Sequence, residues 1–310
     1  MKGQNLEILP RFCVVLNPPG KIAAPHPFRP PCISSPLHFR IGGFSANVFA
    51  MRISVCIICK NEIAKIGVCL DSVAWCDDIV IVDSGSTDGT IEKAASHPAT
   101  PRVINHPWGG YNQQRQFAVG QCRHPWVLAL DADEECSPEL AAEIQNLPEN
   151  QTSAAAMYEM PRKNFIARRY VRCWSPDYQA RLIHQQRVDW DDKSAPEIRR
   201  PKPGFRIPKL KRPLLHNRLS PYITTDINDG PRMAEHAAIL AESLRARGKH
   251  AKMMDMLFRP WLTFLKYYIF RGGFLQGRFG LVICYKTTVG VMLKYSVLYA
   301  QQELDQEGKG

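Results

Sequence analysis

From residue 53 onward the chain alternates short, mainly apolar runs with stretches of helical periodicity. The strand-like runs are Ile53–Cys59, Ile79–Val82, Arg102–His106 and Trp126–Leu130. The helical stretches between them include Ile63, Ile66, Leu70 and Val73 at helical spacing, and Tyr111–Gln121. Unbroken apolar runs of this length are typical of strands that are covered on both faces. The pattern predicts an α/β fold with a mostly parallel, doubly wound sheet and helices on both faces.

The fourth apolar run ends abruptly in acidic residues. Trp126–Glu135 reads WVLALDADEE, so Asp131 and Asp133 directly follow a buried strand. Two carboxylates at the carboxyl end of a strand can hold a divalent cation against a phosphorylated ligand. The alternative is an acidic turn before a helix that starts near Ser137-Pro138, where acids suit the positive helix N-terminus. These ten residues alone do not separate the two interpretations.

Equivalent strand ends favour the binding interpretation. Cys59–Glu62, Asp83–Ser86 and Asp131–Asp133 follow three of the predicted strands, and in a parallel sheet they converge at one edge. No GxGxxG or GxxxxGK[ST] pattern occurs, so neither dinucleotide-binding nor P-loop chemistry is supported. Carboxylates at these positions can instead bind ribose hydroxyls or a metal-bound diphosphate.

Three segments together carry a family resemblance. The stretches SVCIICKNE, VDSGSTDGT and LALDADEE resemble the family 2 inverting glycosyltransferases of the GT-A (Rossmann-like) fold, in which the last is the DxD-type motif. Lys163-Asn164, Trp174–Leu182 and Phe264–Tyr299 are similar to the lipopolysaccharide-core β-glucosyltransferase subgroup, the WaaE/KdtX type. The resemblance covers about residues 51–299 and leaves the first fifty unexplained.

The resemblance implies roles for individual residues on the donor side. Asn61 and Glu62 would line the nucleotide pocket, and Asp83 would bind the uracil or the ribose. Asp131 would help to hold the nucleotide or the metal, while Asp133 would bind Mg²⁺ or Mn²⁺ directly. The metal would in turn stabilise the departing diphosphate.

Arg115, in QQRQFA, resembles a basic residue that the family carries on the third helix. It would meet a phosphate of the donor. A solvated helix face is the alternative for Arg115.

Inverting transfer also needs a general base for the acceptor hydroxyl. The subgroup carries a Val-His-Glu-like segment after its PDxQxRL motif, and this chain reads Ser194-Ala195-Pro196-Glu197 in that region. Glu197 is therefore the expected base, although Pro196 stands where the subgroup has His. Asp177 is the second candidate, and Asp191 or Asp192 stay open as well.

The excess of basic residues indicates which kinds of partner the chain can bind. The chain has 40 Lys and Arg against 29 Asp and Glu, and eight of the basic residues lie between Ile198 and Thr225, where no acid occurs. Such a run forms either a solvated basic face or a binding surface for a phosphorylated, lipid-linked acceptor at an anionic membrane. Interleaved aromatics and an RNP-like pattern are lacking, so no nucleic-acid partner is expected. The ten cysteines are scattered irregularly, as in reduced cytoplasmic proteins.

Three regions are expected along the chain. Residues 1–50 are rich in proline and predict an irregular or disordered extension, and Met51 is a candidate initiator. Residues 51–225 predict the GT-A domain, and residues 226–310 a helical C-terminal region. Lys286 and Lys294 interrupt the apolar stretch Leu281–Tyr299, which argues against a membrane span and favours amphipathic helices at the bilayer surface, with helical core as the alternative.

The sequence thus predicts a metal-assisted inverting glycosyltransferase. It would move a hexose, with glucose expected, from a UDP-sugar to a lipopolysaccharide inner-core sugar, at the inner face of the cytoplasmic membrane and peripheral to it. The alternatives are a family 2 transferase that acts on a polyprenyl phosphate or a capsule glycan, and an inactive nucleotide-sugar-binding or nucleic-acid-binding protein.

Overall fold

The computed structural model describes residues 51–166, 168–191, 198–218 and 230–307. The strands are β1 (Ile53–Cys59), β2 (Ile79–Asp83), β3 (Arg102–Asn105), β4 (Trp126–Asp131), β5 (Glu134–Cys136), β6 (Met157–Ile166), β7 (Arg169–Tyr170), β8 (Tyr178–His184), β9 (Val188–Asp191), β10 (Ile198–Pro201) and β11 (Leu214–Arg218). The helices are α1 (Ile66–Val73), α2 (Thr90–Ala95), α3 (Tyr111–Gly120), α4 (Pro138–Gln145), α5 (Glu149–Thr152), α7 (Gly230–Ala246), α8 (Met253–Leu265) and α9 (Gly277–Glu307), with shorter helical turns η1 (Arg172–Trp174), η2 (Lys266–Phe270) and η3 (Gly273–Gln276).

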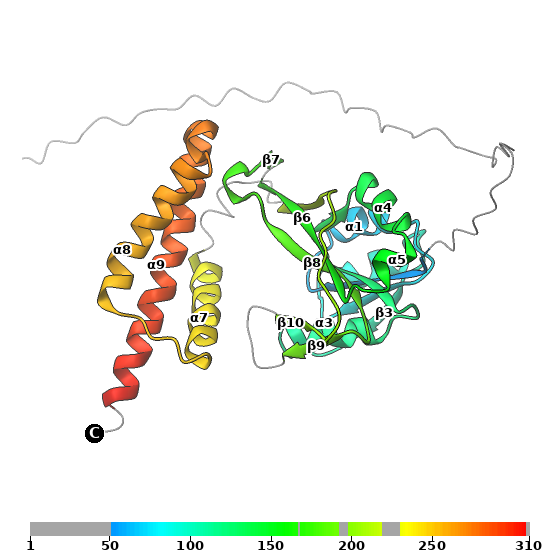
Figure 1. Ribbon diagram of the computed structural model, residues 1–310, viewed down its shortest axis with the longest axis horizontal. Coiled ribbons are helices and arrows are strands. Elements are labelled where there is room, and N and C mark those ends of the chain that lie inside the picture. The colour runs from blue at the N-terminus through cyan, green and yellow to red at the C-terminus, as the bar shows by residue number, and fades with distance from the viewer. Residues whose placement is uncertain (1–50, 167, 192–197, 219–229, 308–310) are drawn as a thin grey trace, which may run out of the picture. The chain divides into compact units, whose positions relative to one another are not determined.

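One large sheet forms the centre of the described residues between 53 and 218 (Figure 1). Its strand order is β3-β2-β1-β4-β8-β6-β11-β5, with β7 paired to β6. The pairs β3-β2, β2-β1 and β1-β4 are parallel, as the alternating pattern predicts. Beyond β4 the sheet becomes mixed, because β8 runs antiparallel to both β4 and β6. The predicted α/β fold is confirmed.

The central strands are buried on both faces. In β1, Val55 and Ile57 belong to one hydrophobic cluster and Cys56 and Ile58 to another, as expected for side chains that alternate across a strand. The first cluster also contains side chains of α1, α2 and α4, whereas the second contains side chains of α3. Helices therefore cover both faces of the sheet, which explains why the apolar runs of the sequence are unbroken.

The cysteines follow the same alternation. Cys56 and Cys59, three residues apart in β1, lie in the two different clusters. They therefore point to opposite faces, as predicted, and cannot share a metal ion. All eight cysteines in the described ranges are free thiols, in agreement with the expectation of reduced cysteines.

Helix α4 begins where the sequence predicts. Ser137 is its N-cap, and its side chain accepts a hydrogen bond from the backbone N–H of Leu140 at 3.2 Å. Pro138 occupies the first helical position, where its missing N–H leaves no hydrogen bond unmade. The helix-cap interpretation of this stretch is thus satisfied by Ser137, so Asp131 and Asp133 need a different explanation.

The C-terminal region is helical, as predicted. Helices α7 and α8 both pack against α9. By length and mean hydropathy, the helical segment Gly273–Gln306 is the one segment of the described residues that is long and apolar enough to cross a membrane, and 17% of its apolar window is buried. Length and composition therefore do not support the argument against a span that Lys286 and Lys294 suggested. The predicted extension 1–50 and the predicted boundary at residue 225 lie outside the described residues.

Candidate active site

The carboxyl ends of β1, β2 and β4 lie side by side at one edge of the sheet. Cys59 at the end of β1 is in register with Asp83 at the end of β2. Ile58, the preceding residue, is in register with Asp131 at the end of β4. The predicted convergence of the three strand ends is confirmed. In open α/β sheets this edge is where ligands bind.

Hydrogen bonds join the segment after β1 to the segment after β2. Asn61 donates its backbone N–H to Ser86 Oγ at 2.8 Å, and its side-chain Oδ1 accepts from Thr87 N at 2.8 Å. Glu62 N donates to Thr90 Oγ1 at 2.8 Å. Asn61 has a φ of 56°, a left-handed conformation that Asn adopts more readily than most residues. Asn61 and Glu62 therefore lie in a braced loop at the sheet edge, and their contact with a nucleotide stays a prediction.

Asp83 shapes the turn that follows β2. Its side chain is fully buried, and the carboxylate accepts hydrogen bonds from Gly85 N at 2.8 Å and Ser86 N at 2.7 Å. Ser84 is 8% exposed, and its hydroxyl accepts from Gln114 Nε2 at 2.9 Å. The structure thus gives Asp83 a part in holding the loop. Its contact with uracil or ribose stays a prediction.

Two guanidinium groups hold the Asp131 carboxylate. Arg115 Nη2 lies 2.7 Å from Oδ1, and Arg181 Nη2 contacts Oδ2. Burial alone would raise the pKa of Asp131, but Arg181 and Arg115 outweigh it and hold the pKa well below its usual range. Arg115 is 1% exposed, so the alternative that it lies on a solvated helix face is wrong. Its contact with a donor phosphate stays a prediction.

The ion pairs continue through Glu134, which is fully buried. Its Oε1 lies 2.7 Å from Arg181 Nη2 and 3.0 Å from Arg162 Nη1, and its Oε2 accepts from Asp131 N at 3.1 Å. Arg162 in turn lies 2.9 Å from Asp177. Acids and arginines therefore alternate from Arg115 on α3 to Asp177 just before β8.

Asp177 is closely surrounded by donors. Its Oδ2 accepts from Arg162 Nε at 2.9 Å and Asn164 Nδ2 at 3.0 Å, and its Oδ1 accepts from Gln179 Nε2 at 2.7 Å. Burial would raise the pKa of Asp177, but Arg162 and these hydrogen bonds lower it overall. Both carboxylate oxygens of Asp177 already accept hydrogen bonds from protein donors, which leaves this acid less free to contact an acceptor hydroxyl. Glu197, Pro196 and Asp192 lie outside the described residues.

Asp133 meets a histidine from a distant strand. His216 Nε2 lies 3.2 Å from Asp133 Oδ2, and His216 Nδ1 lies 2.7 Å from Asn164 Oδ1. The pairing of β11 with β6 places His216 directly opposite Asn164. Burial would raise the pKa of Asp133, but the hydrogen bond with His216 lowers it overall. This contact fixes the His216 ring beside the acid that was predicted to bind metal.

The Asp133–His216 pair fits a divalent cation that is shared with a diphosphate. Carboxylate oxygen is a preferred ligand of Mg²⁺ and Mn²⁺, and imidazole nitrogen suits the softer transition-metal ions, so Asp133 would be the principal ligand and His216 a second one for an ion such as Mn²⁺. Within the part of the chain that the structure describes, no three His, Cys, Asp or Glu residues form a self-contained metal cluster. Mg²⁺ is commonly held by one or two protein ligands together with substrate phosphates. Asp131 suits the role of ligand less well, because each of its oxygens contacts an arginine.

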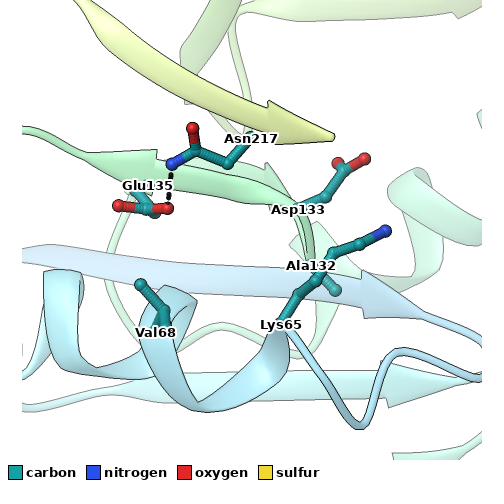
Figure 2. Close-up of a pocket in the computed structure, with 6 residues that line it drawn as sticks. All are labelled: Lys65, Val68, Ala132, Asp133, Glu135 and Asn217. Atoms are coloured by element: carbon teal, nitrogen blue, oxygen red, sulfur yellow. Dashed lines mark hydrogen bonds between the residues drawn. The ribbon is translucent and has the colours of Figure 1, made fainter. Parts of the chain in front are cut away.

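A small hollow lies next to this pair (Figure 2). Its lining consists of Lys65, Val68, Ala132, Asp133, Glu135 and Asn217. Figure 2 shows the Lys65 ammonium and the Asp133 carboxylate extending toward the same side. Lys65 Nζ also lies 2.8 Å from Glu62 Oε2, and its charge helps to lower the pKa of Asp133. This edge of the sheet therefore presents a lysine ammonium as well as carboxylates. Both kinds of group suit a site at which an anionic ligand binds through a metal ion.

The sequence can now be compared with known proteins. The family model described as "Glycosyl transferase family 2" matches residues 54–211, which include β1, β2, β4 and every described acid of the site. The chain belongs to glycosyl transferase family 2. It is therefore a glycosyltransferase, as its motifs predict.

Curated relatives match over a limited stretch. The lipopolysaccharide core biosynthesis glycosyltransferase LpsC of Rhizobium meliloti is 46% identical over 102 residues, which cover 30% of this chain and 38% of LpsC. An uncharacterised glycosyltransferase of Rickettsia prowazekii is 45% identical over 95 residues, which cover 30% of this chain and 32% of that protein. The chain thus spans about a third of the length of these relatives.

Solved structures are similar at a lower level. The S. aureus protein TarS (residues 1–349) in complex with UDP-GlcNAc has a TM-score of 0.44 and 15% identity, over 79% of this chain and 92% of that one. Glucosyl-3-phosphoglycerate synthase from Mycobacterium tuberculosis, solved with Mn²⁺, UDP and glucosyl-3-phosphoglycerate, has a TM-score of 0.40 and 17% identity, over 64% and 81% of the two chains.

Several residues of the site were not singled out from the sequence. Glu134 lies in the DxD-type segment but had no expected role, Arg162 and His216 lie in no motif, and the three are brought together because β5, β6 and β11 are neighbours in the sheet. Arg181, inside the Trp174–Leu182 segment, pairs with Asp131 and Glu134. In the sequence, Glu134 could have been noticed by its place in the acidic run. No sequence feature pointed to His216.

Proposed function

We propose that this glycosyltransferase transfers a hexose, with glucose expected, from a UDP-sugar to an inner-core sugar of lipopolysaccharide, with inversion at the anomeric carbon. The acceptor class is supported by the 46% identity to LpsC of Rhizobium meliloti, a lipopolysaccharide core biosynthesis glycosyltransferase. The donor class is supported by the motifs that end β1, β2 and β4. The observation that carries the proposal is the Asp133–His216 pair at the carboxyl edge of the sheet.

The site separates into a nucleotide side and a diphosphate side. The loop of Asn61 and the turn held by Asp83 form the nucleotide side. Asp133, His216 and Lys65 form the diphosphate side. A divalent cation held by Asp133 and His216 would neutralise the charge that develops on the leaving diphosphate. Lys65 adds a fixed positive charge beside that position.

The buried ion pairs hold the diphosphate side in place. Asp131 is fixed by Arg115 and Arg181, and Asp133 follows it after one residue. Asp133 also accepts a hydrogen bond at its backbone carbonyl from Asn217 N at 3.1 Å. The Asp133 carboxylate is therefore positioned from both sides of the turn, so little reorganisation is needed when the diphosphate binds.

The general base is assigned to Glu197 from the family resemblance, because protein donors already contact both oxygens of the other candidate, Asp177. Two matched neutralising substitutions compare the candidates. Glu197→Gln keeps UDP-sugar affinity and loses transfer, whereas Asp177→Asn retains transfer and loses stability through its broken contact with Arg162. Normal transfer by Glu197→Gln together with lost transfer by Asp177→Asn moves the assignment to Asp177.

A transfer assay tests the proposed function directly. The full chain is incubated with radiolabelled UDP-glucose, Mn²⁺ and truncated lipopolysaccharide cores of increasing length, and label in the saccharide is measured. Asp133→Asn and His216→Gln are the inactive controls, and Glu139→Gln, at an exposed position of α4, is the matched active control. Transfer to one core length that both site variants abolish supports the proposal. Transfer only to a polyprenyl phosphate contradicts the proposed acceptor while leaving the donor site intact.

A further inference from the structure

Helix α8 exposes its most apolar side to solvent. Met253, Met254, Leu257, Phe258, Trp261, Leu262 and Leu265 recur at helical spacing, and each is at least 42% exposed. The stripe continues into η2 and η3 with Ile269, Phe270, Phe274 and Leu275, of which Phe270 is 84% exposed. These eleven side chains are called the apolar stripe here. Contiguous exposed apolar surface of this kind marks an interaction site, since isolated soluble chains rarely carry it.

Positive charge borders the apolar stripe. From residue 249 to residue 278 the basic residues are Lys249, Lys252, Arg259, Lys266, Arg271 and Arg278, against the single acid Asp255. Asp255 is paired with Arg259 at 2.6 Å, so it does not offset the other basic residues. Large apolar and aromatic residues flanked by Lys and Arg are the pattern of a helix that lies in the headgroup region of an anionic bilayer.

Helix α9 and η3 contact the catalytic part, meaning the described residues between 53 and 218. These contacts determine which side of the C-terminal helices is available to a membrane. Trp174 Nε1 donates to Thr287 Oγ1 at 3.0 Å, and Arg172 N donates to Gln276 Oε1 at 2.9 Å. Phe279, Ile283 and Cys284 of α9 share a buried cluster with Ile166, Val171 and Cys173. One face of the segment from Gln276 to Thr287 is therefore covered by the catalytic part, whereas Leu281, Val282 and Tyr285 on its other side are exposed.

The remainder of α9 is too polar to cross on its own. Residues 288–306 include Lys294, Gln301, Gln302, Glu303 and Asp305, whereas a span requires about 20 predominantly apolar residues. The exposed apolar surface of this region belongs mainly to α8, η2 and η3.

We propose that the apolar stripe docks on the surface of an anionic lipid bilayer, with α8 lying parallel to the membrane plane. Trp261 and Phe270 insert between the lipid headgroups, and the flanking lysines and arginines contact lipid phosphates. The docking needs neither nucleotide nor acceptor, and so goes beyond the proposed transfer reaction. Because the tip of the α8–α9 hairpin contacts the catalytic part through Gln276 and Thr287, docking also holds the enzyme beside a lipid-anchored acceptor.

Vesicle flotation of the full chain tests the docking. Vesicles of phosphatidylcholine alone are compared with vesicles that contain about 30% phosphatidylglycerol, at low salt and at about 0.5 M salt. The wild-type protein is expected to float with the anionic vesicles, with weaker binding at high salt. Trp261→Glu with Phe270→Glu is expected to reduce binding about 100-fold, since each buried aromatic contributes about tenfold. Lys249→Ala with Lys266→Ala is expected to reduce it about 30-fold.

Leu304→Glu is the matched control. Leu304 is 67% exposed on α9 and lies outside the apolar stripe, so this variant is expected to bind like the wild type. Equal binding by the Trp261 and Phe270 double variant overturns the proposal. So does binding that resists alkaline carbonate extraction, which indicates a span. A third contrary result is a dimer in lipid-free solution that the double variant converts to monomer, because a second copy of the chain then covers the stripe. UDP binding is measured on each variant, and its retention separates a failure of docking from a failure of the donor site.

Discussion

Replacing Arg181 by Met removes the guanidinium that joins Asp131 to Glu134. The Arg181 side chain is 5% exposed, contacts Asp131 Oδ2 and lies 2.7 Å from Glu134 Oε1. Met keeps much of the side-chain volume, so the substitution mainly tests charge. After it, Asp131 retains Arg115 at 2.7 Å and Glu134 retains Arg162 at 3.0 Å. Each acid thus loses one of its two cationic partners.

The expected decrease in the free energy of unfolding follows from this partial loss of cationic partners. Removing one partner of a buried ion pair typically costs about 3–5 kcal/mol, because a buried charge is left uncompensated. Since both acids keep a second arginine, the lower end applies, and Arg181→Met should lower the free energy of unfolding by about 3 kcal/mol. For a chain of this size that loss corresponds to a decrease in Tm of about 6–12 °C.

Urea unfolding followed by circular dichroism measures the change, with Arg212→Met as the exposed control that stays within about 0.5 kcal/mol of the wild type. A second variant adds Glu134→Gln to Arg181→Met, which removes the one excess negative charge that the loss of Arg181 leaves among these residues and should restore part of the stability. A loss below about 1 kcal/mol in Arg181→Met, or no recovery in the double variant, contradicts the conclusion that these contacts hold the site together.

Three further results are expected. Asp83→Ala removes the acceptor of the Gly85 and Ser86 N–H groups, so the KM for the donor should rise more than kcat falls, which steady-state kinetics measures. Ser137→Ala removes the α4 cap and should lower the free energy of unfolding by about 1 kcal/mol without changing UDP affinity. The folded-state pKa values of Asp131, Asp133 and Asp177 are lowered, so their stabilisation is present above about pH 4 and is lost as the pH falls through those lower values; acid titration of stability should show this, and a loss that begins near pH 6 contradicts it.

The sequence predicts the parts of the fold that depend on local pattern. The first apolar run has the same bounds as β1, and the acids Asp83 and Asp131 lie at the ends of their strands, because burial on both faces leaves an unbroken apolar signal. Ser137 was recognisable as an N-cap from its neighbour Pro138. The confirmed features of this kind all depend on neighbours in sequence.

Features that depend on strand order were beyond the sequence. His216 meets Asp133 across 83 positions, through a sheet in which β11 lies between β6 and β5. For Arg115 the sequence left a phosphate contact and a solvated helix face open, and the structure shows it buried in an ion pair with Asp131. Polar residues buried in pairs have no periodic signal, because each is compensated by a partner elsewhere in the chain.

Calorimetric titration with UDP tests the central assignment most directly. The wild-type chain is titrated with UDP in the presence of Mn²⁺ and again with EDTA, beside Asp133→Asn and His216→Gln. The assignment predicts UDP binding by the wild type that EDTA weakens at least about tenfold, and the same weakening in both variants with Mn²⁺ present. Equal UDP affinity with EDTA, or in a folded His216→Gln variant, contradicts the placement of the diphosphate at the Asp133–His216 pair.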